Sequence, residues 1–374
     1  MTEGMVLWNV RERWEGGWQP PVGALYKLFR RFRNCSAGAF KLPRIYLDHA
    51  ATTPLRPEAL AAMQEGLRLW ANPSSPHAEG RAARRALEDA RERVKAALGW
   101  SGEVIFTSGA SEAAALALGR TKAPRRIVSA VEHDAVFGAA PDAKVLPVVA
   151  GRPDFGAIGG GGALVAVQQL SSETGTILLS GAEQVRDDNL LLSDCSQSAG
   201  KLALPDADML ILSAHKFGGP IGVGALLLRD YAMLEPSGGH ERGYRRGTEN
   251  LPGVLGMAAA LEAGRMESWT TSETERLAFR DTLGEVLAPG AQCSWIFAVT
   301  HPTLSAQALL IRLDAAGFAV SAGSACSSGT LKQSRALAGF GVEEGVARRT
   351  IRVSLGWNTT AEELERFAEA WRGL

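Results

Sequence analysis

One cysteine stands among small residues near the carboxyl end of the chain. Residues 321–329 read SAGSACSSG, so Cys326 has only serine, glycine and alanine around it. Serine and glycine at this density favour turns over helix or strand, and no residue of the stretch is large enough to pack a core. A cysteine in such a loop is either available for thiol chemistry or incidental, and the stretch alone leaves both interpretations open.

A lysine follows an apolar run in the middle of the chain. The stretch DMLILSAHKFGGPIGVGALLL places Ser213, His215 and Lys216 between two such runs. A lysine between two buried strands is costly unless it is paired, deprotonated or covalently engaged. Lys216 is therefore a candidate for amine chemistry.

Two further apolar runs end in polar residues. LLLSDCSQSAGK ends a run with Asp194 and places Gln197 three residues later. An acid at that point needs a donor or a cation as partner, although a helix N-cap would also explain it. EVIFTSGASE predicts a strand, a small-residue loop and a helix start, where free N–H groups at Gly109, Ala110 and Ser111 would face an anion.

A lysine, an acid and a loop for an anion are the parts that pyridoxal 5′-phosphate (PLP) needs. The lysine forms a Schiff base with the cofactor, and the acid keeps the ring nitrogen protonated so that the ring accepts electrons. Loop amides and hydroxyls hold the phosphate. The residue types therefore predict a PLP enzyme.

The elements that must position these residues alternate along the chain. Helical segments, among them RPEALAAMQEGLRLW with Leu60, Met63, Leu67 and Trp70 at helical spacing, are interspersed with short apolar runs. The runs are EVIFT, RIVSA, KVLPVV, ALVAVQ, LLLSD, DMLILS and GVGALLL. Runs that are apolar on successive residues are typical of strands buried on both faces, so we predict an α/β fold with a mainly parallel sheet flanked by helices. The polar residues lie where such sheets bind ligands.

The organisation into domains follows from the same pattern. After residue 255 the chain predicts helices plus the strands SWIFAV and TIRVSL, a smaller α+β unit. We expect a large cofactor-binding domain at 57–252 and a small domain made of 44–56 and 253–374. Residues 1–43 predict a poorly ordered extension, with a start codon assigned too early or a basic amphipathic docking segment as alternatives.

Composition excludes several classes of function. The 374 residues include 40 basic and 40 acidic side chains, and a net charge of zero argues against nucleic-acid and membrane-surface partners. Four cysteines without a C-x-x-C pair indicate neither a metal site nor a disulfide framework, which fits a reducing cytoplasm. Cys195 and Cys293 are interpreted as small buried residues, and Cys35 lies in the extension. No apolar run approaches the roughly 20 residues of a membrane span.

From about residue 44 to its end the chain resembles the cysteine desulfurases, members of the class V aminotransferase group with the fold-type I architecture. The resemblance is carried by IYLDHAATTP, FTSGASE, VEHDAV, DCSQSAGK, SAHKFGGPIGVGAL, GGHERGYRRGT, SAGSACSSG and IRVSLG, in this order. It implies conversion of L-cysteine to L-alanine, with the sulfur left as a persulfide on Cys326. A protein acceptor would then take the sulfur for iron–sulfur cluster assembly or thiolation.

The same resemblance implies roles for individual residues. Lys216 would bind the cofactor covalently, and His133 would stack on its ring and assist proton transfer. The ring nitrogen would pair with Asp194, and the ring oxygen with Gln197 and Ser172. The phosphate ligands would be Ala110, Ser111, Ser213, His215 and, from the neighbouring subunit of a homodimer, Thr248. Arg352 would bind the substrate carboxylate as a two-pronged donor.

The chain also departs from the family pattern. QQLSSETG has Ser171 and Ser172 where the family commonly has two asparagines, so Ser172 is a shorter stand-in for the contact to the ring oxygen. The segment between His133 and Gln169, and the one between VAVQQ and LLLSD, are shorter than expected, so part of the large domain is trimmed. The loop around Cys326 resembles the family's longer-loop type.

Two alternatives remain at this point. Another enzyme on the same scaffold, such as an aminotransferase or a selenocysteine or cysteine-sulfinate lyase, does not need Cys326 in the same way. An inactive PLP-binding partner protein would explain the trimmed segments. Retention of both Lys216 and Cys326 counts against the inactive protein.

Overall fold

The computed structural model describes residues 44–181, 185, 188–322 and 334–374. Its large sheet has the strand order β2-β10-β9-β8-β7-β3-β4. The strands are β2 (Glu103–Thr107), β10 (Gly224–Leu228), β9 (Met209–Ser213), β8 (Leu190–Asp194), β7 (Ala163–Ala166), β3 (Arg125–Ser129) and β4 (Lys144–Leu146). Only β10 runs against the others, because it pairs antiparallel with both β2 and β9. The prediction of a mainly parallel sheet is confirmed.

All seven apolar runs form strands, but one of them is divided. KVLPVV splits at Pro147 into β4 and β5 (Val148–Val149), and β5 pairs with β6 (Arg152–Pro153) in a separate ribbon. Proline has no backbone N–H to donate to a ladder, so the strand ends where Pro147 stands.

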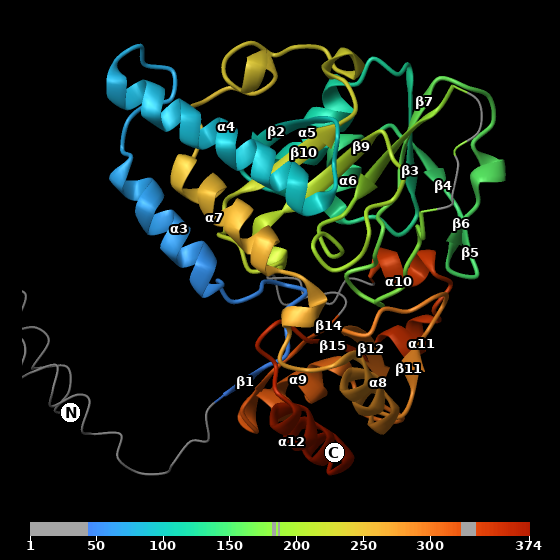
Figure 1. Cartoon of the computed structure of the whole chain (residues 1–374). Helices are drawn as coiled ribbons and strands as arrows, with labels where there is room; N and C mark the ends of the chain where they lie inside the picture. Colours follow the sequence, from blue (N-terminus) through green and yellow to red (C-terminus); the bar gives the residue numbers. More distant parts are fainter. Residues whose placement is uncertain (1–43, 182–184, 186–187, 323–333) are drawn as a thin grey trace, which may run out of the picture. The chain divides into compact units, whose positions relative to one another are not determined.

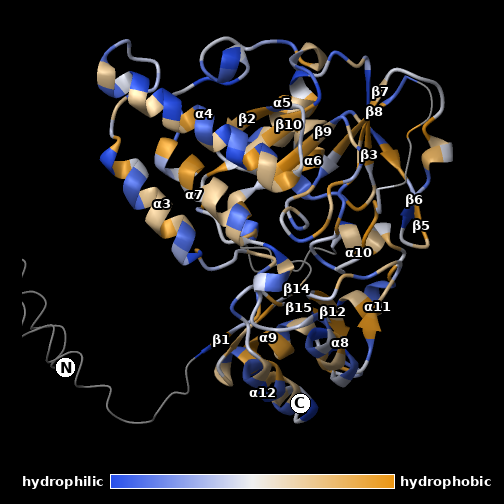
Figure 2. Cartoon of the chain, in the orientation of Figure 1, coloured by the Kyte–Doolittle hydropathy of each residue, from blue (hydrophilic) through white to orange (hydrophobic). Residues whose placement is uncertain are grey.

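Helices cover both faces of the large sheet (Figure 1). One group consists of α3 (Pro57–Arg68), α4 (Ala78–Leu98) and α7 (Leu251–Ala263), and the other of α5 (Ala110–Arg120) and α6 (Asp134–Ala139). Successive residues of a strand serve opposite faces: Phe106 belongs to the buried cluster that contains Leu87 of α4, whereas Ile105 belongs to the one that contains Leu118 of α5. Hydrophobic strands between helices of mixed hydropathy are evident in Figure 2. This double coverage explains why the strands are apolar on every residue.

Three of the four large residues in the predicted apolar stripe are exposed. Leu60, Leu67 and Trp70 are 48%, 65% and 80% exposed, whereas Met63 is half-buried. Small residues supply much of the packed face of α3, because a Cβ on Gly66 would lie 2.6 Å from Pro252 Cα of α7. The close approach of α3 and α7 therefore requires glycine at position 66. The spacing of the large residues along α3 did not predict this contact.

A second, antiparallel sheet has the order β11-β12-β15-β14. Its strands are β11 (Val286–Leu287), β12 (Ile296–Thr300), β15 (Thr350–Ser354) and β14 (Ser321–Ala322). The accompanying helices are α8 (Glu273–Thr282), α9 (Ala306–Ala315), α10 (Arg335–Gly339), α11 (Glu344–Ala347) and α12 (Ala361–Arg372). β1 (Ile45–Tyr46) pairs with β13 (Phe318–Ala319), so the first described residues join the carboxyl-terminal part, as the predicted small domain requires. The domain boundaries themselves stay a prediction.

The described residues between β7 and β8 contain no helix. The trimming of the large domain stays a prediction. Across the ranges that the structure describes, no helix is both long and apolar enough to cross a membrane. The predicted extension at 1–43 and Cys326, the predicted nucleophile, lie outside the described residues.

Candidate active site

A cavity of about 890 Å³ opens at the carboxyl ends of the large sheet's parallel strands. Both sheets contribute to it, since its wall includes Asp194 at the end of β8, Lys216 after β9 and Arg352 on β15. The predicted site residues on its wall are Ala110, Ser111, His133, Ser172, Asp194, Gln197, Ser213, His215, Lys216 and Arg352. The fold therefore brings together residues that are up to 242 positions apart, from 110 to 352.

Lys216 lies at the end of a short 3₁₀ turn (Ala214–Lys216) that follows β9 directly. Its Nζ donates hydrogen bonds to the carbonyl oxygens of Ala50 and Ala51, each at 2.7 Å. Burial, reinforced by the positive charge of Arg352, lowers the pKa of Lys216 to about 8. An amine with this pKa is neutral, and therefore nucleophilic, in a substantial fraction of molecules at mildly alkaline pH.

Asp194 and Gln197 line the cavity from the end of β8. Asp194 Oδ1 accepts a hydrogen bond from the N–H of Ser196 at 2.8 Å, so the acid also caps the following turn. Gln197 is 5% exposed, and its Nε2 donates to the Ala50 carbonyl at 2.8 Å. Its buried Oε1 has no partner among the described residues. A buried polar atom without a partner on a cavity wall indicates that a polar ligand completes the site.

The part of the wall that is predicted to bind the phosphate includes the first turn of α5. Gly109 precedes this helix with φ +150°, and a Cβ on Gly224 would lie 2.7 Å from Gly109 Cα. Glycine at both positions lets β10 and the loop approach closely, which leaves the helix N–H groups facing the cavity. His215 binds Thr52 Oγ1 through Nδ1 at 3.1 Å, and burial lowers its pKa to about 4, so its ring is neutral at pH 7.

Arg352 also lies on the cavity wall. Its Nη2 lies 2.8 Å from Asp48 Oδ1, and its Nη1 donates to the Ser172 carbonyl at 3.0 Å. The buried Nε of Arg352 has no partner in the part of the chain that the structure describes. A guanidinium with a free donor in a cavity can bind a carboxylate. In this structure Asp48 binds Nη2 of Arg352.

His133 and Thr248 differ in their relation to the cavity. His133 is exposed on the cavity wall and caps α6, because its Nδ1 accepts a hydrogen bond from the N–H of Ala135 at 3.1 Å. The neutral ring therefore carries its proton on Nε2. Thr248 is exposed and is not on the wall of this cavity, so its predicted contact with a neighbouring subunit stays a prediction.

Three glutamates on the cavity wall escaped the sequence analysis: Glu112, Glu132 and Glu173. Burial raises the pKa of Glu132 to about 8, although Gln168 N–H and Ser129 Oγ bind its Oε1. Burial also raises the pKa of Glu173 to about 7, although Ser334 Oγ donates to it. Each glutamate lies within a stretch that bears on the family resemblance: Glu112 in FTSGASE, Glu132 in VEHDAV and Glu173 in QQLSSETG. Membership of these stretches was the available signal.

The residues present fit PLP by their chemistry. The cavity supplies a depressed-pKa lysine, an acid, an unpartnered amide oxygen and the amino-terminal turn of a helix, which match the aldehyde, ring and phosphate of that cofactor. Cys195 and Cys293 do not compete as nucleophiles. Both are buried, and burial raises the pKa of their thiols to about 12 and about 11.

A fold-type I sheet with a lysine-bearing cavity at its strand ends defines a class of PLP-dependent enzymes. The family model described as aminotransferase class-V matches residues 45–367. The chain therefore belongs to the class-V aminotransferase family.

Similar proteins narrow the relationship further. A curated relative from Cereibacter sphaeroides, named cysteine desulfurase, is 35% identical over 88% of this chain and 95% of its own length. The solved structure of a NifS-like protein from Rickettsia africae is 26% identical, with a TM-score of 0.78 over 88% of this chain and 99% of that one. The structure titled SspA in complex with cysteine is 27% identical, with a TM-score of 0.71 over 84% and 100% of the two chains.

Proposed function

We propose that the protein is a PLP-dependent cysteine desulfurase that converts L-cysteine to L-alanine and leaves the sulfur as a persulfide on Cys326. The observation that carries this proposal is the convergence of Lys216, Asp194 and Arg352 on one cavity from separate strands. The name of the Cereibacter sphaeroides relative and the cysteine bound to the SspA structure support the same substrate.

Each residue has a task that its surroundings allow. Lys216 holds the cofactor, Asp194 keeps a proton on the ring nitrogen, and the first turn of α5 with Ser213 and His215 holds the phosphate. When bound, PLP supplies an electron sink that weakens the bonds at the substrate's Cα and Cβ.

The substrate end of the cavity works through charge and proton position. Arg352 exchanges the Asp48 carboxylate for that of L-cysteine, which fixes the orientation of the amino acid. His133 carries a movable proton at Nε2 on the cavity wall and serves as the acid and base for the substrate.

The sulfur transfer balances without an external oxidant. The Cys326 thiolate forms an S–S bond to the substrate sulfur while the Cβ–S bond breaks, and Cβ gains a proton to give alanine. The net reaction is L-cysteine plus the enzyme thiol giving L-alanine plus the enzyme persulfide. A protein acceptor then removes the terminal sulfur by thiol exchange, and a homodimer in the cytoplasm, completed by Thr248 from the neighbouring subunit, is the expected form of the enzyme.

Replacement of Cys326 tests the proposal. Cys326→Ser should bind PLP and L-cysteine normally but release almost no sulfide with a reductant present, because a hydroxyl cannot take up sulfur as a persulfide. Wild-type protein treated with L-cysteine alone should gain the mass of one sulfur on the peptide that contains Cys326.

Cys293→Ser is the matched control, since its thiol is buried and has a raised pKa. This variant should keep full sulfide release. Full release by Cys326→Ser, or extra sulfur on Cys195, would refute the proposal and favour a lyase in which Cys326 is incidental.

A further inference from the structure

Glu112 puts a carboxylate on the part of the cavity wall that is predicted to bind the phosphate. It lies in the first turn of α5 and lines the cavity together with Ser108, Gly109, Ala110 and Ser111. A carboxylate in this turn suits the helix dipole, but it repels a phosphate dianion that uses the same N–H groups. The site therefore needs a cation to neutralise Glu112.

Arg245 is that cation. Its Nε lies 3.1 Å from Glu112 Oε1, and the two side chains are only 18% and 28% exposed. The other oxygen of Glu112 accepts a hydrogen bond from the N–H of Ser108 at 2.5 Å. Burial alone would raise the pKa of Glu112, but Ser108 and Arg245 outweigh burial and lower it, so the carboxylate is charged and paired.

Arg245 also holds the segment that carries Thr248. Its Nη1 donates to the carbonyl oxygens of Gly247 and Thr248 at 3.1 and 3.4 Å. One guanidinium thus joins Glu112 on the cavity wall to Thr248, which is predicted to reach the phosphate of the neighbouring subunit.

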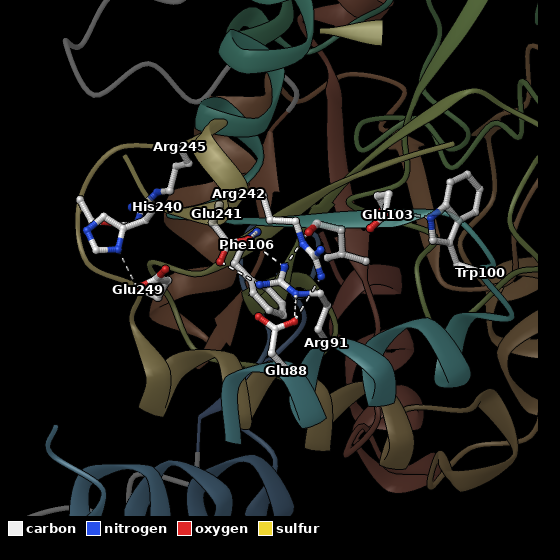
Figure 3. Close-up of polar contacts among 12 residues, drawn as sticks. Glu88, Arg91, Trp100, Glu103, Phe106, His240, Glu241, Arg242, Arg245 and Glu249 are labelled. Atoms are coloured by element: carbon white, nitrogen blue, oxygen red, sulfur yellow. Dashed lines mark hydrogen bonds and ion pairs between the residues drawn. The ribbon is translucent and has the colours of Figure 1, made fainter. Parts of the chain in front are cut away.

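The segment around Arg245 is itself anchored by a buried ion pair (Figure 3). Glu241 and Arg242 have left-handed φ values of +47° and +55°. Residues other than glycine adopt such backbone angles only when the surrounding structure imposes them. Glu241 is bound by Arg91 through both oxygens, at 2.8 and 3.0 Å, with side chains 3% and 1% exposed for Arg91 and Glu241.

This ion pair completes the free edge of β2. Arg91 Nη1 donates to the Val104 carbonyl at 2.6 Å, and Glu241 Oε2 accepts from the N–H of Phe106 at 2.8 Å. The two side chains satisfy the edge groups as a neighbouring strand would. Because β2 leads directly to Ser108, the segment with Arg245 is fixed to the same strand that positions the anion-binding loop.

We propose that Arg245 is a positioning residue for the cofactor phosphate, neutralising Glu112 so that the first turn of α5 accepts the dianion, and holding Thr248 in place. This inference rests on the proposed PLP dependence. It assigns Arg245 no contact with the cofactor itself.

The test compares ligands with and without a phosphate on the full-length, cofactor-depleted chain. Arg245→Met should raise the dissociation constant of PLP roughly tenfold or more, because it leaves an unpaired carboxylate beside the phosphate. The dissociation constant of pyridoxal, which lacks the phosphate, should change by less than about twofold, since no dianion meets Glu112. Adding Glu112→Gln should return PLP affinity to within about threefold of wild type.

Two further variants sharpen the result. Arg246→Met is the matched control, since Arg246 Nε donates only to the Ser237 carbonyl among the contacts that the structure records, and it should leave PLP affinity unchanged. Glu112→Gln alone keeps Arg245 and should not weaken PLP, which keeps the inference testable even where Arg245→Met fails to fold.

Several outcomes would overturn the inference. The inference would fail if Arg245→Met left the affinity for PLP unchanged, or lowered the affinities for PLP and pyridoxal equally. It would also fail if Glu112→Gln weakened PLP binding. Each result would show that the Arg245–Glu112 pair has only a structural role. A wild-type chain that binds no PLP would overturn the proposed function instead, so the two failures are distinguishable.

Discussion

Removal of Arg91 should destabilise the folded chain far more than removal of a surface arginine. Its partner Glu241 has 1% exposed side-chain surface and three hydrogen bonds, two from Arg91 and one from the N–H of Phe106. Arg91→Met leaves that carboxylate buried without a countercharge, and it leaves the Val104 carbonyl without its donor. Breaking a buried ion pair on one side costs roughly 3–5 kcal/mol, so we expect a loss of that size in the free energy of unfolding.

The double variant Arg91→Met/Glu241→Gln should lose less free energy of unfolding than the two single variants lose in sum. A neutral glutamine at 241 can still accept the Phe106 hydrogen bond, and no buried charge is left. The remaining loss is that of the unpaired Val104 carbonyl, roughly 1–3 kcal/mol. The sum of the losses in unfolding free energy for Arg91→Met and Glu241→Gln should therefore exceed the loss for the double variant by several kcal/mol. Such an excess is the signature of a coupled pair.

An exposed ion pair of the same chemistry serves as control. Arg93 and Glu262 lie 2.6 Å apart, closer than Arg91 and Glu241, but their side chains are 39% and 42% exposed. Exposed pairs contribute about 1 kcal/mol at most, so Arg93→Met should barely shift a urea unfolding curve. Equal effects of Arg91→Met and Arg93→Met would refute the reasoning, because distance rather than burial would then determine the effect.

Two further predictions follow from pKa values in the cavity. Because burial lowers the pKa of Lys216 to about 8, the rate at which PLP attaches to the cofactor-depleted chain should rise with pH, reach half its maximum near pH 8 and level off above it. Borohydride should fix no cofactor on Lys216→Ala, and fixation through another lysine would contradict the assignment. Burial raises the pKa of Glu132 from 4.5 to about 8 in the folded chain, so between these pH values the folded state retains a proton that the unfolded state has lost. Stability should fall as pH rises through this window, and Glu132→Gln should flatten the fall in urea titrations, whereas an unchanged slope would exclude Glu132 as its source.

The sequence predicts the large sheet well because both of its faces are buried. A strand covered by helices on two sides must be apolar on every residue, so runs such as LLLSD and DMLILS are recognisable without knowledge of their neighbours. Polar residues at the ends of these runs then stand out, and Asp194 and Lys216 are found for that reason. The observed cavity lies where the strand ends predicted it.

Interactions between distant segments could not be predicted in this way. Arg91 and Glu241 are separated by 150 positions, and Glu112 and Arg245 by 133. Each is an ordinary charged residue in its own segment, and only the fold removes it from water. The packed face of α3 was hidden for a related reason, since its contacts depend on small residues such as Gly66, which leave no hydrophobic signal.

The segment that follows β1 contacts both Lys216 and Arg352. The Ala50 and Ala51 carbonyls accept hydrogen bonds from Lys216 Nζ. Asp48 Oδ1 pairs with Nη2 of Arg352, and the N–H of Ala50 donates to Ser354 Oγ at 2.9 Å, two residues beyond Arg352 on β15. In the proposed function, a covalent bond at Lys216 would remove donors from this segment, and a substrate carboxylate at Arg352 would displace Asp48 from it. Both binding events would therefore act on the same few residues, Asp48 to Ala51.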